Sequence, residues 1–168
     1  MEETLEPGKL TIVAMSDLHG MIPTFGIPNG DVLVIAGDIC PDRPTGKGGF
    51  FPDPMGQAEW LDETFEPWFR TLPHPHKLIT WGNHDFSARN EKWRGKVCVE
   101  ETIVIKGVKF WLSPWSPQYG SWAWMKDEAG LAKVYAQIPS DADVIVSHAP
   151  AHGLCVRSPN GYRGPGYG

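Results

Sequence analysis

Four short apolar runs in this chain each end directly in a cluster of Asp, His or Asn side chains. The runs cover residues 10–15, 31–36, 77–81 and 143–146, and they carry the aliphatic and β-branched residues typical of buried strands. In open α/β sheets, ligand sites form at the carboxyl ends of the strands, where loops diverge over a rigid support. If these four strands are neighbours, their polar ends converge on one place.

Two helices and three further strands complete the expected pattern. Apolar residues recur at helical spacing over residues 57–70 and 126–138. Pro67 should distort or terminate the last turn of the first helix, because proline lacks an N–H and its ring crowds the preceding turn. The additional strands are expected at 97–99, 102–105 and 108–112. This mixture within 168 residues predicts a single α/β domain.

The net charge and the cysteines restrict which partners and which metal or disulfide sites are expected. The formal net charge of −5 argues against a long nucleic acid as partner, since phosphate backbones are held by basic surfaces. A small anionic substrate stays compatible, because bound metal ions supply positive charge locally. Cys40, Cys98 and Cys155 form no C-x-x-C pair, so neither a thiolate zinc site nor a disulfide framework is expected. The apolar runs are far shorter than the roughly 20 residues of a membrane span, and we expect a cytoplasmic protein without a membrane partner.

The polar clusters consist of groups that bind divalent metals. Carboxylate, imidazole and amide ligands suit manganese, iron, nickel or zinc, and the candidates are Asp17, His19, Asp38, Asn83 and His148. Asp17 and His19 should project to the same side of an extended segment. Asp38 can bridge two ions with its two oxygens, and Asn83 offers a neutral oxygen. Any one cluster can be a turn that closes a strand, whereas all of them in this order predict a metal centre.

The same residues carry a resemblance to a known family. The motifs D-x-H at 17–19, G-D at 37–38, G-N-H-D at 82–85 and the later His148 resemble those of calcineurin-like metallophosphoesterases, in particular a small phosphodiesterase-like, phage-type branch. The resemblance runs from about residue 10 to residue 168. It implies a two-sheet β-sandwich flanked by helices, in four layers α/β/β/α. It also implies that Asp17, His19 and Asp38 hold a first metal ion, and that Asp38, Asn83 and His148 hold a second.

The resemblance further implies a reaction. Two divalent ions clamp a phosphoryl group and activate a bridging water as hydroxide. Manganese is the expected metal, and iron, zinc and nickel are the alternatives. His84 faces the substrate and stabilises phosphoryl charge or protonates the leaving oxygen, and Asp85 is expected to orient a neighbouring imidazole. We expect hydrolysis of a small phosphodiester or phosphomonoester. The alternative is a non-catalytic or impaired metal- or nucleotide-binding member of the same fold.

One motif of the family is missing from residues 1–168. A G-H-x-H sequence normally follows the position of His148 and completes both metal sites, and this chain contains none. Three interpretations follow: a domain whose C-terminal part is missing, a substitute ligand in His152, or a degenerate protein. The sequence makes no prediction of the oligomeric state.

Tryptophans are concentrated in one segment. Trp111, Trp115, Trp122 and Trp124 lie close together in the sequence. They either pack in the core, as large aromatic side chains usually do, or line a substrate cleft.

Overall fold

Two three-stranded sheets form the centre of the molecule in the computed structural model, which describes residues 9–42, 52–89, 93 and 96–150. The first sheet is parallel, with the order β1 (Ile12–Met15), β2 (Val32–Ala36) and β3 (His76–Thr80). The second has the order β4 (Glu101–Ile105), β5 (Val108–Ser113) and β8 (Val144–Ser147), with β4 antiparallel and β8 parallel to β5. A short pairing joins β6 (Ser116–Pro117) to β7 (Met125–Lys126).

The central strand β2 is buried on both faces, which explains its uninterrupted apolar sequence. Val32 and Val34 face the second sheet and pack in one cluster with Phe110, Leu112 and Val146. The alternate residues of β2 point the other way, into a cluster with helical and loop residues that includes Leu33, Ile35, Leu61, Phe65 and Trp93. Side chains on successive strand residues point to opposite faces, so β2 contributes to both cores of the sandwich.

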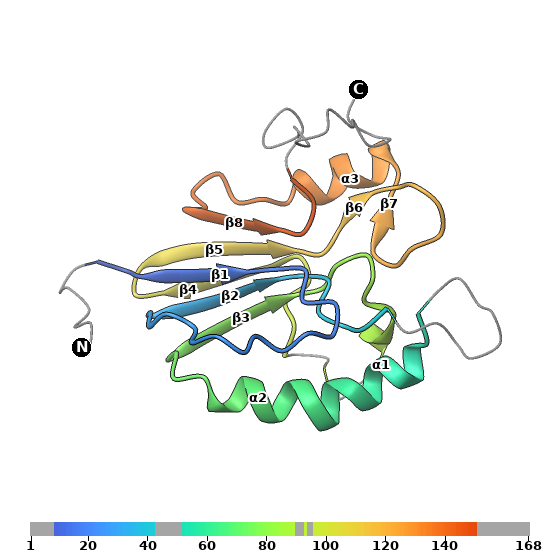
Figure 1. Cartoon of the computed structure of the whole chain (residues 1–168). Helices are drawn as coiled ribbons and strands as arrows, with labels where there is room; N and C mark the ends of the chain where they lie inside the picture. Colours follow the sequence, from blue (N-terminus) through green and yellow to red (C-terminus); the bar gives the residue numbers. More distant parts are fainter. Residues whose placement is uncertain (1–8, 43–51, 90–92, 94–95, 151–168) are drawn as a thin grey trace, which may run out of the picture.

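Helices lie outside both sheets. A continuous helical segment covers the outer face of the first sheet (Figure 1) and consists of α1 (Pro54–Trp60), the π-helical η1 (Leu61–Phe65) and α2 (Glu66–Thr71). The helix α3 (Glu128–Tyr135) lies beyond the second sheet, next to β6 and β7 (Figure 1). These layers confirm the mixed α/β fold expected for a metallophosphoesterase. None of the helices in the described part of the chain has the length and apolar character that a bilayer crossing requires.

The first helix differs from the prediction at its start and in its middle. It begins at Pro54, where the Asp53 side chain accepts the Met55 N–H at 3.1 Å as an N-cap. A wide π-helical turn lies directly before Pro67, and there the Glu66 N–H donates to the Leu61 carbonyl. Proline crowds the turn that precedes it, so the distortion lies before Pro67 and not in the last turn, where it was expected; the helix continues as α2 to Thr71.

Two further predictions of secondary structure need correction. The strand expected at 97–99 is reduced to an isolated bridge at Val97 and one hydrogen bond of 2.8 Å from the Cys98 N–H to the Ile79 carbonyl. Glu100 has a φ of 52°, a left-handed conformation that ends any extended run there. The second helix stops at Tyr135, three residues before its expected end.

Candidate metal centre

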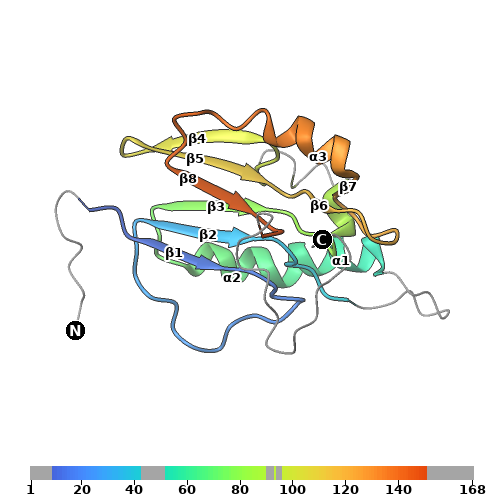
Figure 2. The ribbon, with the colours of Figure 1, turned by 90° about the horizontal axis from the view of Figure 1, so that it is seen from above.

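The loops that follow β1 and β2 are joined to each other by backbone hydrogen bonds beyond the ends of the strands. The Asp17 N–H donates to the Gly37 carbonyl at 3.0 Å, and the His19 N–H donates to the Asp38 carbonyl at 2.9 Å. Strands β1, β2, β3, β5 and β8 all point toward the same end of the molecule, as two perpendicular views show (Figures 1 and 2). The polar clusters therefore meet at one end, as strand geometry in α/β proteins predicts.

The segment that carries Asp17 and His19 is a tight turn, so the expectation of an extended segment is wrong. Both residues have left-handed φ angles, 56° and 43°, and Asp38 has a φ of 50°. Non-glycine residues rarely adopt this conformation, and such residues cluster at functional sites. The turn brings the two side chains toward Asp38, and ligand atoms of all three residues lie within 4.8 Å of one another.

Asp38 lies at the centre of the site. Its Oδ2 atom is 3.7 Å from His19 Nε2, and its Oδ1 atom is 3.3 Å from His148 Nε2. Oδ1 also accepts the His84 N–H at 2.8 Å. The two oxygens of one buried carboxylate thus face two different histidines, which is the arrangement that a bridging ligand needs.

His148 links the second sheet to the first. Its Nδ1 atom lies 2.9 Å from the Ala36 carbonyl oxygen and its Nε2 atom lies 3.0 Å from Asn83 Oδ1. An imidazole that donates one N–H to a backbone carbonyl presents its other nitrogen in a fixed direction, as metal-binding histidines do. Burial acts to lower the pKa of His148, but the hydrogen bond and charge of Asp38 outweigh burial and raise this pKa to about 9. Both ring nitrogens of His148 therefore face acceptor oxygens.

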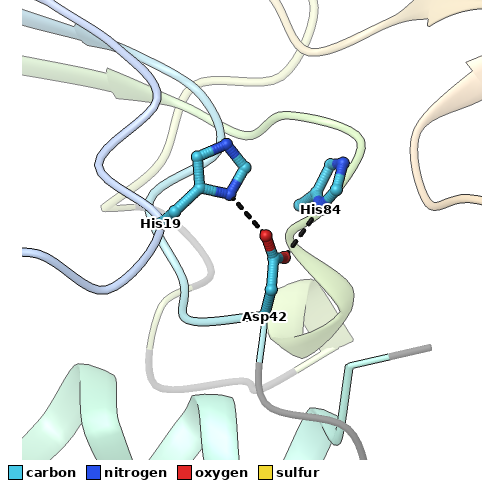
Figure 3. A group of neighbouring side chains, drawn as sticks. All are labelled: His19, Asp42 and His84. Carbon is cyan, nitrogen blue, oxygen red and sulfur yellow. Dashed lines mark hydrogen bonds and ion pairs between the residues drawn. The ribbon is translucent and has the colours of Figure 1, made fainter. Parts of the chain in front are cut away.

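Asp42 is a member of the site that sequence reasoning missed. Its Oδ1 lies 2.7 Å from His84 Nδ1 and its Oδ2 lies 2.8 Å from His19 Nδ1, so one carboxylate lies between two imidazoles (Figure 3). The two rings are 4.9 Å apart, centroid to centroid, in an edge-on arrangement. The available signal was a second aspartate four residues after Asp38 in the same loop.

Asp85 does not occupy the position expected for it. Its side chain is fully buried; Oδ1 accepts the backbone N–H groups of Ile39 and Cys40 at 3.0 and 2.9 Å, and Oδ2 accepts the Gly82 N–H at 2.7 Å. Burial raises the pKa of this carboxyl group to about 6, against the opposing effect of these N–H groups. Asp85 thus ties the loop after β2 to the loop after β3, and Asp42 is the carboxylate that contacts the His84 ring.

The segment between β6 and β7 covers one side of the site. The ring of Trp122 stacks on the ring of His84 at a centroid distance of 4.1 Å. The side chain of Asn83 donates from Nδ2 to the Tyr119 hydroxyl at 3.2 Å, and the backbone carbonyl of Asn83 accepts the Ala123 N–H at 3.0 Å. The tryptophans were expected either in the core or near the substrate. Trp111 is buried in the core, and Trp122 lies at the site.

These residues fit divalent metal ions. Oxygen and imidazole donors from Asp17, His19, Asp38, Asn83 and His148 lie together, although their roles as ligands stay predictions. In addition, His19 Nδ1 is a buried nitrogen that has no aligned hydrogen bond among the described residues, while it lies near the Asp42 carboxylate. Carboxylate oxygens and imidazole nitrogens are ligands that suit divalent first-row metals. His152, the possible substitute ligand, lies outside the described residues.

Fold and site together define an α/β sandwich with a candidate metal centre at the carboxyl ends of its strands. The family model for calcineurin-like phosphoesterases matches residues 10–167. The chain belongs to this family.

Several curated relatives have similar sequences. A human protein named metallophosphoesterase domain-containing protein 1 is 22% identical over 179 residues, which cover 88% of this chain and 51% of the human protein. The Caenorhabditis elegans UPF0046 protein K07C11.7 is 25% identical over 165 residues, 86% of this chain and 52% of the relative. An Emericella nidulans protein named probable rhamnogalacturonate lyase C is 27% identical over 83% of this chain, but the match covers 13% of that protein. The chain thus spans about half the length of two of these relatives, and a small part of the third.

Proposed function

We propose that this chain hydrolyses a small phosphate ester, a phosphodiester or a phosphomonoester, with two divalent metal ions, manganese being the expected metal. The observation that carries the proposal is the position of Asp38, whose two carboxylate oxygens face His19 on one side and His148 on the other. Family membership supports a phosphoesterase. The net charge of −5 argues against a long nucleic acid as substrate.

The bound metal ions would neutralise charge on the phosphoryl group and make water a stronger nucleophile near neutral pH. Asp17, His19 and Asp38 would hold one ion, and Asp38, Asn83 and His148 the other. The backbone hydrogen bonds of the loops after β1 and β2 set the positions of these ligands before any substrate arrives. Such preorganisation is what a catalytic metal site requires of the protein.

His84 is the proposed substrate-facing group. Asp42 holds its Nδ1 at 2.7 Å and Trp122 stacks on its ring, so the imidazole has one orientation with Nε2 directed away from Asp42. In this orientation His84 can donate a hydrogen bond to a phosphoryl oxygen or to the leaving oxygen. We also propose a cytoplasmic location, because no C-x-x-C pair occurs and Cys40 and Cys98 are unbridged.

The test is hydrolysis of an aryl phosphodiester and an aryl phosphomonoester by the purified chain, with and without manganese. We expect manganese-stimulated turnover that Asp38→Ala and Asn83→Ala abolish, while Asp141→Ala, a change at an exposed aspartate, leaves it intact. Absence of turnover for both esters in the manganese-saturated protein would contradict the proposal. If calorimetry then found a single weakly held metal ion, the non-catalytic metal-binding alternative would take its place.

A further inference from the structure

Gln57 is a buried polar residue that the metal centre itself does not use. It lies in the first turns of α1, and its side chain is 1% exposed. The Nε2 atom donates to the carbonyl oxygens of Pro41 at 3.2 Å and His84 at 2.8 Å. The Oε1 atom accepts the backbone N–H groups of Phe86 at 2.8 Å and Ser87 at 3.1 Å.

These four hydrogen bonds use the whole capacity of one carboxamide, which has two N–H donors and two acceptor lone pairs. Every partner is a backbone group, and the partners come from two loops that are far apart in the sequence. Pro41 directly precedes Asp42. The other three partners are His84 and the first two residues of η2 (Phe86–Arg89). Gln57 therefore determines how far the backbone at Asp42 lies from the backbone at His84.

We propose that Gln57 is a positioning residue: by its hydrogen bonds to two loops it holds Asp42 and His84 at the distance at which their side chains contact each other. The inference rests on the proposed function, since it assigns to Gln57 the alignment of the substrate-facing imidazole. Asp85 ties the same two loops together nearer the metal ligands, through Ile39, Cys40 and Gly82. Gln57 fixes their outer part, where the Asp42–His84 contact lies.

Two substitutions separate the hydrogen bonds of Gln57 from its volume. Gln57→Glu keeps the shape but places an oxygen against the carbonyl oxygens of Pro41 and His84, so two attractive contacts become repulsive. Gln57→Met keeps most of the volume and removes all four hydrogen bonds. Because small misplacements of catalytic groups cost up to about 100-fold in rate, we expect kcat to fall roughly 10- to 100-fold in both variants, with KM changed by less than about threefold.

The structural readout is ¹⁵N NMR of the imidazoles in the metal-free chain, with His84 assigned from a His84→Gln variant. We expect the His84 ring-nitrogen signals to move in Gln57→Glu and Gln57→Met. The same exchange at an exposed amide, Gln137→Glu, should leave both the signals and kcat unchanged. Thermal unfolding of each variant shows whether it is folded. Gln57→Asn, which keeps the amide on a shorter side chain, replaces any variant that does not fold.

A double-mutant cycle with Asp42→Asn tests whether Gln57 acts through the pair. If it does, Gln57→Met lowers kcat by a smaller factor in the Asp42→Asn background than in the native chain. Full additivity, or a folded Gln57→Met variant with native His84 signals, would overturn the inference. If the native chain had no turnover at all, the proposed function would fail, while the NMR comparison would still decide whether Gln57 positions His84.

Discussion

The carboxylate of Asp42 and the imidazole of His84 lie 2.7 Å apart, although the two residues are 42 positions apart in the chain. The second oxygen of the same carboxylate lies 2.8 Å from His19 Nδ1 (Figure 3). One aspartate thus contacts both a candidate metal ligand and the proposed substrate-facing group. A carboxylate behind a metal-binding imidazole sets the orientation of the ring and its basicity, so Asp42 can influence metal binding and catalysis together.

Asp42→Asn should lower turnover by about 10- to 100-fold, which is the usual effect of removing a carboxylate that supports a ligand. Asparagine keeps the size of the side chain but is uncharged and has one oxygen, so it cannot place an oxygen beside both imidazoles. The measurement is manganese-dependent hydrolysis of an aryl phosphate ester, together with calorimetric metal affinity. Asp141→Asn removes a carboxylate from an exposed ion pair with Lys109 and serves as the matched control. Native turnover in Asp42→Asn would show that its contacts with the two histidines do not matter for catalysis.

The metal-free protein should lose stability as the pH rises from about 6.5 to 9. His148 has a folded-state pKa of about 9 against an ordinary value of 6.5, since the effect of Asp38 exceeds that of burial. A raised histidine pKa stabilises the fold fully below the unfolded pKa, and this contribution disappears as the pH passes the folded pKa. The contribution of the pair is at most about 3 kcal/mol.

Urea unfolding of chelator-treated protein between pH 6 and 10 measures this effect. The His148→Gln variant should show a flatter profile, because it has no imidazole to titrate at this position. Saturating manganese should also flatten the profile, since a metal ligand must be a neutral imidazole throughout the range. A native profile that is level from pH 6.5 to 9 would contradict the pairing of His148 with Asp38.

Gly82→Ala should damage the site and the fold together. A Cβ atom at this position would overlap the Oδ1 atom and the backbone nitrogen of Asp38. Overpacking of this kind costs typically about 1–3 kcal/mol, and here it also displaces the central carboxylate. We expect a lower melting temperature and weaker metal binding in calorimetry. Gly26→Ala is the control, because a Cβ there has no neighbour within 4 Å, and equal behaviour of the two variants would refute the expectation.

Much of the fold could be predicted from local patterns. The apolar run at 31–36 predicted a buried strand, and in the structure Val32 and Leu33 of this strand pack in the two opposite cores. Pro67 was expected to distort or end the last turn of the first helix, whereas the structure has a π-helical turn before this residue and a regular helix after it. The strand expected at 97–99 was wrong because three apolar residues cannot outweigh the left-handed turn at Glu100.

Residue order alone showed which strand ends carry polar side chains, and the expectation that Asp17, His19, Asp38, Asn83 and His148 meet depended on those strands being neighbours. Hydrophobic patterns record where a strand begins and ends, whereas the parallel pairing that brings these strand ends together is a feature of the folded chain. The folded chain alone showed that Asp42 lies between two imidazoles, that Gln57 is hydrogen-bonded to two loops and that Trp122 stacks on His84. These contacts join segments far apart in the chain, and side chains of the same types occur in ordinary loops and helices. Their roles therefore depend on packing, which residue spacing does not encode.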